Sequence, residues 1–252
     1  MQEINGKKFF TIYEISYLLK KEFTPDEIKL RIENEELLGQ KIDNEWHINE
    51  ETVNFLVDVM INHKIDCSRI FGIKEQKVNL SNIKLEGLIL DIGGGGEGVI
   101  SQFKKDKVIA IDHNKRELEE APEGGVKIIM DAGELKFLDN TFDTVTSFFT
   151  LMYIPKSEHK KIFKEIYRVL KKDGHLVLWD VIIPKRENQI HEMFSLPLKI
   201  KIDDKELDTG YGVFWGKKEQ NLEYFQKLSI KVGFSEVKFK SDDQIFYLRV
   251  KK

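Results

Sequence analysis

The fold of this chain is decided by residues 87–100, GLILDIGGGGEGVI. An apolar run leads directly into a glycine-rich turn, and a helical pattern follows the turn. Glycine lets a backbone turn sharply and lets a ligand approach it closely. The stretch therefore predicts a strand, a ligand-binding turn and a helix, in that order.

Two cofactor-binding motifs overlap in this turn. Gly93, Gly95 and Gly98 have the G-x-G-x-x-G spacing of dinucleotide sites. Asp91, Gly93 and Gly95 have the D-x-G-x-G spacing found in sites for S-adenosylmethionine (SAM). The turn alone leaves both cofactors open.

Strand and helix patterns alternate after the turn. Strands are predicted at 87–92, 107–112, 126–131, 142–149 and 175–183, with helices at 96–103, 115–121 and 159–172. Near the end, a helix at 222–232 precedes the runs SEVKFK and IFYLRV, whose short SDDQ link makes them an antiparallel hairpin. We expect an α/β, doubly wound, Rossmann-like fold with a mostly parallel sheet, a C-terminal antiparallel hairpin, and ligands at the carboxyl ends of the strands.

Three features favour SAM over a dinucleotide. The charge of Asp91, just before the turn, would repel a pyrophosphate but suits the ammonium group of a methionine. Asp131, at the end of the third strand, is placed to accept from an adenine amino group. The terminal hairpin is the third feature, because a dinucleotide fold more often continues with parallel strands. Asp112 suits either cofactor, since both carry a ribose.

The stretches ILDIGGGGEG, VIAIDHN, IIMDAGELKFLDNTFDTVTSFFTLMYI and EIYRVLKKDGHLVLWDV resemble the class I SAM-dependent methyltransferases, especially the small-molecule branch related to quinone biosynthesis. The resemblance spans most of residues 87–252 in the family's order. It implies that SAM is held by Asp91, Gly93, Gly95, Asp112, His113, Asp131, Ala132, Phe148 and Phe149. The chain departs from the family at Glu97, where a glycine is common, so the end of the loop should be shaped differently.

The acceptor of the methyl group is expected to be a small molecule, with a protein side chain as second choice. Displacement at a sulfonium needs mainly an aligned nucleophile and exclusion of water, so the use of a general base stays open. Cys67 lies before the catalytic region, which argues against cytosine-carbon methylation, and FTLMYIP differs from the motif of base-amine methyltransferases. One cysteine and six scattered histidines give no spacing for a metal site.

Two polar residues are candidates for acceptor contact or catalysis. Tyr153 follows the fourth predicted strand, and its alternative role is to pack a loop. Asp180 lies in the apolar run LVLWDVII, where burial would raise its pKa and suit it to act as a base. The alternative is that Asp180 caps a neighbouring loop.

Residues 184–216 are too long for an ordinary strand-to-helix connection. Apolar residues alternate through LPLKIKI, Asp203-Asp204 offers a turn, and an aromatic cluster follows. We expect a lid over the acceptor site, with Phe214 and Trp215 contacting the acceptor. The same alternation would also suit a homodimer interface or a hairpin that covers a sheet edge.

Residues 1–62 have the pattern helix, helix, hairpin, helix, with a capping box from Thr24 to Glu27 before the second helix and Asp43-Asn44 in the turn of the hairpin. The stretches FTIYEISYLLK, TPDEIKLRIENEELLGQKI and EWHINEETVNFL resemble the winged helix-turn-helix of excisionase and MerR-type regulators. Residues 1–60 carry seven Lys and Arg against thirteen Asp and Glu, so DNA binding is not expected. A substrate-side or dimerisation role for this module is favoured, and residues 63–86 are interpreted as a linker before the domain at 87–252.

Composition agrees with a cytoplasmic enzyme. The formal net charge of -3 and the isoelectric point near 6.1 give no global reason to expect a nucleic-acid or membrane partner. The N-terminus MQEINGKKFF has no apolar signal core, and the lone Cys67 fits a reducing compartment. Two alternatives remain: a SAM-sensing regulator that uses the first module, and an NAD(P)-dependent oxidoreductase.

Overall fold

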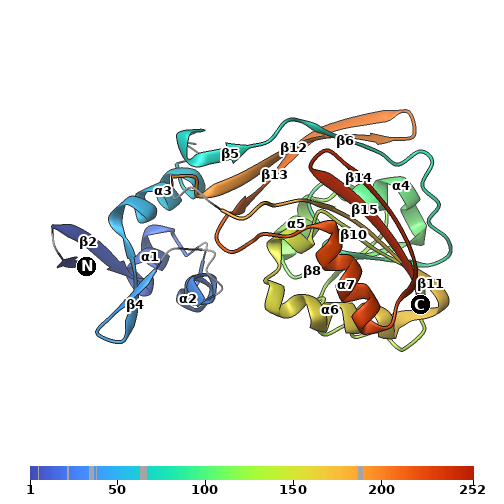
Figure 1. The fold of residues 1–252 in the computed structure, drawn as a ribbon, viewed down its shortest axis with the longest axis horizontal. Helices are drawn as coiled ribbons and strands as arrows, with labels where there is room; N and C mark the ends of the chain where they lie inside the picture. Colours follow the sequence, from blue (N-terminus) through green and yellow to red (C-terminus); the bar gives the residue numbers. More distant parts are fainter. Residues whose placement is uncertain (5, 22, 34–36, 38, 63–66, 187–189) are drawn as a thin grey trace. The chain divides into compact units, whose positions relative to one another are not determined.

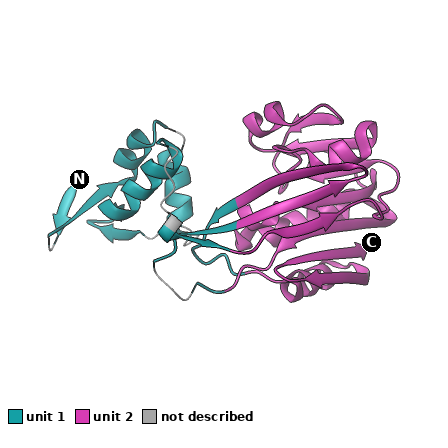
Figure 2. Ribbon diagram, turned by 90° about the horizontal axis from the view of Figure 1, so that it is seen from above, with its two compact units in different colours: residues 1–72, 185–195, 212–219 teal, residues 73–184, 196–211, 220–252 magenta. Residues whose placement is uncertain are grey.

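The computed structural model describes residues 1–252 except 5, 22, 34–36, 38, 63–66 and 187–189 (Figure 1). It forms two compact units (Figure 2). Unit 1 contains Met1–Gly72, Lys185–Ser195 and Gly212–Glu219, and unit 2 contains Ile73–Pro184, Leu196–Tyr211 and Gln220–Lys252. The long insert between the fifth predicted strand and the last helix therefore contributes residues to both units.

Unit 2 is built on a seven-stranded sheet with the order β14-β15-β11-β10-β7-β8-β9. Its strands are β7 (Ile89–Ile92), β8 (Val108–Asp112), β9 (Val126–Ile129), β10 (Phe142–Phe148), β11 (Leu170–Val181), β14 (Ser235–Asp242) and β15 (Ile245–Lys251). The pairs from β11 to β9 are parallel, whereas β15 pairs antiparallel with both β11 and β14. The sheet is thus mixed, which corrects the prediction of a mostly parallel one: the C-terminal hairpin joins the main sheet beside its longest strand.

The helices of unit 2 pack on this sheet. They are α4 (Val99–Lys104), α5 (Lys115–Glu120), α6 (Lys156–Val169) and α7 (Leu222–Val232), with short 3-10 turns η2 (Lys105–Lys107) and η3 (Leu151–Tyr153). Helices α6 and α7 pack side by side over a core that includes Phe163, Phe225 and Phe246 (Figure 1). Helix α6 ends three residues earlier than predicted, because Leu170 starts β11 and pairs with Phe142.

The insert forms a long hairpin, β12 (Met193–Ile202) and β13 (Lys205–Phe214), with Asp203 at φ +51° in the turn. The predicted alternation is confirmed along β12, where every second residue from Phe194 to Ile202 is buried. Residues 187–189 of the insert lie outside the described residues. The segment interpreted as a linker contains two strands, β5 (Ile70–Gly72) and β6 (Gln76–Asn79), and both pair parallel with β12. Residues 63–66 of that segment are not among those described.

The N-terminal part of unit 1 is an antiparallel sheet of order β1-β2-β4-β3 packed with helices. Its elements are β1 (Gln2–Ile4), β2 (Lys7–Thr11), α1 (Ile12–Leu18), α2 (Pro25–Glu33), β3 (Gln40–Ile42), β4 (Glu45–Asn49), α3 (Glu50–Met60) and η1 (Cys67–Arg69). The predicted capping box is confirmed, since Thr24 and Glu27 each accept from the other's backbone N–H. The sequence analysis missed β1 and β2.

Side chains from α1, α2, β4 and α3 form the core of this part, among them Ile15, Ile28, Ile48 and Leu56. Among the described residues of the whole chain, no helix combines the length and apolarity that crossing a membrane requires.

Candidate functional site

The glycine turn follows β7 and is held against the neighbouring strand. The N–H groups of Gly93 and Gly94 both donate to the carbonyl of Ile111, at 2.8 and 3.0 Å. Gly93 has φ +70°, and a Cβ added there would lie 2.3 Å from the Thr150 side chain. A Cβ on Gly95 would lie 2.5 Å from Glu117. Both glycines are therefore required by the packing of the turn itself.

Asp91 lies at the end of β7 and is buried beneath the turn, with 2% of its surface exposed. Its Oδ1 accepts a hydrogen bond of 2.6 Å from the Thr146 hydroxyl on β10. Burial raises the pKa of the Asp91 carboxyl to about 7; the Thr146 bond opposes this shift, and nearby Asp112 adds to it. A cation bound beside Asp91 would favour the ionised form of its carboxyl.

Asp112 ends β8, one strand away from Asp91. Its Oδ1 accepts from the N–H of Asn114 at 2.8 Å, and its Oδ2 would lie 3.1 Å from a Cβ on Gly95. His113, also expected to bind the cofactor, is exposed, with its Nδ1 3.5 Å from Asp112 Oδ1. Burial raises the pKa of Glu117, and the charges of Asp112 and Glu97 add to this effect. Carboxyl groups thus surround the turn.

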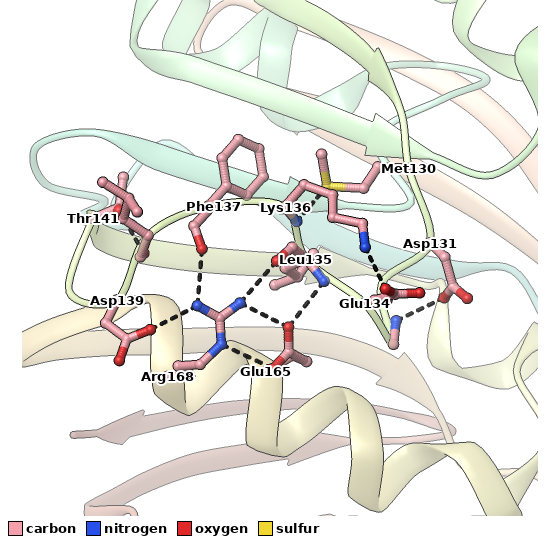
Figure 3. A network of polar contacts seen from close by, with 12 residues as sticks. Met130, Asp131, Glu134, Leu135, Lys136, Phe137, Asp139, Thr141, Glu165 and Arg168 are labelled. Atoms are coloured by element: carbon pink, nitrogen blue, oxygen red, sulfur yellow. Dashed lines mark hydrogen bonds and ion pairs between the residues drawn. The ribbon is translucent and has the colours of Figure 1, made fainter.

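Asp131 follows β9 and begins a loop along the same edge of the sheet. Its Oδ1 accepts from the N–H of Gly133 at 2.7 Å, so the side chain caps its own turn, while Ala132 packs against the core. Figure 3 shows how the loop is secured: Arg168 of α6 donates to the carbonyls of Leu135 and Phe137, both at 2.8 Å. Arg168 is fixed in turn by ion pairs with Asp139 and Glu165. The loop that begins at Asp131 is therefore held in place by α6.

Two buried phenylalanines mark the end of β10. The rings of Phe148 and Phe149 meet edge to face, with centroids 4.9 Å apart. Phe149 has φ +50°, a conformation that costs energy for a bulky residue. The next residue, Thr150, donates from its hydroxyl to the carbonyl of Ile92 at 3.1 Å, which ties the end of β10 to the start of the glycine turn.

The catalytic candidates differ in exposure. Tyr153, in η3, is 44% exposed. Asp180 is fully buried in β11, where its Oδ1 accepts from the backbone N–H of Val181 at 2.8 Å and from Gln220 Nε2 at 2.7 Å. Its Oδ2 has no hydrogen-bond partner among the described residues, although the N–H groups of Met152 and Leu151 face the carboxyl and oppose the rise in its pKa. Burial dominates and raises the pKa of Asp180 to about 7.

The insert reaches the glycine turn through residues that the sequence analysis missed. The carboxylate of Glu97 accepts from the hydroxyls of Thr209 and Tyr211 on β13, the latter at 3.0 Å. The ring of Tyr211 lies 5.8 Å from that of Phe149. The departure from the glycine pattern at Glu97 was the one signal in the sequence, but it did not indicate the partners.

Phe214 and Trp215 were expected to contact the acceptor, and the structure gives them other surroundings. Trp215 is 4% exposed and packs on Phe71 and Phe194, with ring centroids at 4.7 and 5.7 Å. Phe214 packs against the core of the N-terminal part of unit 1. Phe214 and Trp215 thus both pack against residues of unit 1. The aromatic residue of the insert that lies beside the glycine turn is Tyr211.

No cluster of three or more His, Cys, Asp or Glu side chains with the geometry of a metal site occurs in the part of the chain that the structure describes. The arrangement beside the turn consists of carboxyl groups, glycines with close backbone packing, and aromatic rings. Such a set suits a ligand that carries positive charge, hydroxyl groups and a flat ring.

Comparison with known proteins identifies the chemistry. Residues 90–178 match the model of a methyltransferase domain. A ubiquinone/menaquinone biosynthesis C-methyltransferase of Hydrogenovibrio crunogenus is 27% identical over 67% of this chain and 75% of its own length. A demethylmenaquinone methyltransferase of Thermotoga maritima is 28% identical over 44% of this chain and 51% of its own.

Among solved structures, a SAM-dependent methyltransferase of Methanosarcina mazei covers 69% of this chain and 96% of its own, with 20% identity and a TM-score of 0.48. The chain spans 60% or less of the length of several other curated relatives, such as the ubiquinone/menaquinone biosynthesis C-methyltransferase of Idiomarina loihiensis. The matched region is a methyltransferase domain, and its cofactor is SAM.

Proposed function

We propose that this SAM-dependent methyltransferase transfers the methyl group to a small-molecule acceptor, held beside the glycine turn of unit 2. The observation that carries the proposal is the pair of carboxyl groups, Asp91 and Asp112, placed at the ends of adjacent parallel strands on either side of the turn. SAM carries a positive charge and ribose hydroxyls, which suit those two groups.

In this proposal, Asp91 with Gly93 and Gly95 holds the methionine part of SAM, and Asp112 accepts from the ribose hydroxyls. The adenine lies along the loop that Arg168 secures, bordered by Asp131 and Ala132. Phe148 and Phe149 line the site from the end of β10. The exposed ring of His113 contributes at most at the rim.

The acceptor is proposed to be flat and largely apolar. Tyr211, whose ring packs against the buried Phe149, and Tyr153 present aromatic surface near the turn, which suits a ring. One relative named above is a ubiquinone/menaquinone biosynthesis C-methyltransferase and another is a demethylmenaquinone methyltransferase, so a ring of the quinol class is the first to test. The alternatives of a regulator and of an NAD(P)-dependent oxidoreductase are not supported by these matches.

The reaction needs little acid-base chemistry from the chain. SAM supplies a methyl group on a sulfonium, which is already an activated leaving group. The residues around the turn bind and align the two reactants and exclude water, and such positioning can contribute on the order of 7 to 11 kcal/mol. Asp180 is separated from solvent and held by Gln220, so we propose a positioning role for it beneath η3.

Residues 1–62 are proposed to form a winged-helix-like module. The hairpin of β3 and β4, with Asp43 and Asn44 at φ +48° and +67°, takes the place of the wing after α1 and α2. The net negative charge of the module favours a role other than DNA binding. The methyltransferase domain is proposed to be residues 87–252, after a segment at 63–86.

The replacement Asp112→Ala tests the cofactor site. It removes hydrogen bonds between a charged group and the ribose, so SAM affinity measured by calorimetry should fall by about 1.5 to 3 kcal/mol, on the order of 10- to 150-fold. Asp106→Ala, an exposed aspartate in η2 of the same unit, is the matched control and should bind SAM normally. Equal affinity of the Asp112→Ala variant and the wild type would refute the assignment.

A further inference from the structure

The side chain of Glu97 joins two parts of unit 2 that are far apart in the sequence. It lies in the glycine turn, while Thr209 and Tyr211 lie on β13, 112 and 114 residues away. Both hydroxyls donate to the same carboxylate, one to each oxygen. Hydrogen bonds to a charged acceptor are stronger than those between neutral groups, so this is a firm attachment.

A second attachment lies next to the first. Lys205 Nζ, at the start of β13, lies 2.6 Å from Gln102 Oε1 in α4. Gln102 also donates from its Nε2 to the carbonyl of Glu97 at 2.6 Å. The hairpin is thus fastened to both the turn and the helix that follows it.

The attachment orients an aromatic ring beside the strained end of β10. Tyr211 is held by its hydroxyl on Glu97, and its ring is tilted by 36° against Phe149. Burial raises the pKa of the Tyr211 phenol, and the charge of Glu97 adds to this effect, so the phenol keeps its proton and remains a donor. Gly210 and Gly212 flank Tyr211 on β13.

Glu97 has acidic neighbours around the turn. Glu117 is one of its acidic neighbours and feels the charges of both Glu97 and Asp112. Like charges repel, and a bound cation in their midst would relieve that repulsion. These carboxyl groups therefore favour a positively charged ligand in the turn.

We propose that Glu97 and Tyr211 are positioning residues that fasten the β12–β13 hairpin over the glycine turn and retain SAM beneath it. The inference rests on the proposed function, because it takes the ligand of the turn to be SAM. The fastened hairpin excludes water and sets the Tyr211 ring as a wall of the acceptor site. Release of the product S-adenosylhomocysteine then requires the two hydroxyls of β13 to leave Glu97.

The rate at which the full-length chain releases S-adenosylhomocysteine tests the proposal. It is measured by stopped-flow displacement with excess SAM. Tyr211→Phe removes one hydroxyl, Thr209→Val removes the other, and Glu97→Gln removes the charged acceptor. Each variant should release the product on the order of tenfold faster, the effect expected for one hydrogen bond to a charged group. The double variant Glu97→Gln/Tyr211→Phe should be little faster than Glu97→Gln alone, because both changes break the same contact.

Asp208→Asn is the matched control. Asp208 lies on the same strand with its side chain 75% exposed, and it pairs with Lys199 at 3.4 Å. This variant should release the product at the wild-type rate. Melting temperatures of all variants separate a structural role from a positioning role: a lower melting temperature with an unchanged release rate would overturn the proposal.

The two proposals fail in different ways. If the wild-type chain does not bind S-adenosylhomocysteine, the assignment of SAM to the turn is wrong. If the wild type binds it and the Glu97, Thr209 and Tyr211 variants release it at the wild-type rate, SAM still binds at the turn but the hairpin does not retain it. Additive effects in the double variant would show that Glu97 and Tyr211 act independently.

Discussion

At the scale of single residues, Asp180 shows how burial couples a side chain to pH. Its folded-state pKa of about 7 lies above the ordinary value of an aspartate, because the carboxyl is fully buried. The folded chain therefore binds a proton at Asp180 that the unfolded chain has already lost. This proton adds to the free energy of unfolding. Its contribution is fully present below about pH 4 and is lost as pH rises towards 7.

The replacement Asp180→Asn is predicted to stabilise the protein at pH 8 more than at pH 5. The amide has no charge to bury, and its oxygen can still accept from Val181 and Gln220. The gain at pH 8 relative to pH 5 should reach on the order of 2 kcal/mol, measured by urea unfolding of both proteins at each pH. An equal difference at the two pH values would contradict a raised pKa at this position.

At the scale of elements, the turn between β7 and α4 shows two separate demands on glycine. Gly93 and Gly98 both have positive φ, +70° and +53°. Only Gly93 is also crowded: a Cβ there would lie 2.3 Å from Thr150, whereas the nearest atom to a Cβ on Gly98 is 3.5 Å away. Backbone strain is common to the two positions, and steric overlap distinguishes them.

Gly93→Ala is therefore predicted to be more damaging than Gly98→Ala. Gly98→Ala should cost about 1 to 2 kcal/mol through its left-handed backbone alone. Gly93→Ala should cost about 1 to 3 kcal/mol more, because Thr150 and the end of β10 have to move, and SAM binding should weaken with it. Chemical unfolding and SAM titration of both variants measure this; equal stability losses would show that the overlap is relieved without cost.

At the scale of the whole molecule, the acidic N-terminal part raises the question of nucleic-acid binding. Residues 1–60 carry thirteen acidic and seven basic side chains, and phosphate contacts need cations. The full-length chain is predicted not to retard duplex DNA at physiological salt. Binding tighter than micromolar, weakening steeply as salt is raised, would reverse this and give the winged-helix-like module a regulatory role.

The amino-acid sequence alone was enough to predict the features that depend on neighbouring residues. It predicted the strand-turn-helix unit at the glycines, the capping box of Thr24 and Glu27, and the turn at Asp43-Asn44. It also placed Asp91 and Asp112 at strand ends, and parallel pairing of β7 with β8 then brings them to the same edge. Each of these follows from local backbone preference or from strand periodicity, which a single sequence contains.

The pairings between distant segments could not be predicted from the sequence and are seen only in the folded chain. β15 lies against β11, which makes the sheet mixed, and β12 pairs with β5 and β6 from a segment interpreted as a linker. The same holds for the aromatic residue that faces the turn. Successive side chains of a strand point to opposite faces, so Thr209 and Tyr211 share the face of β13 that meets Glu97, whereas Phe214 lies on the other face and packs in unit 1. The pattern shows that the faces of β13 differ, but which face meets which partner depends on contacts more than a hundred residues apart.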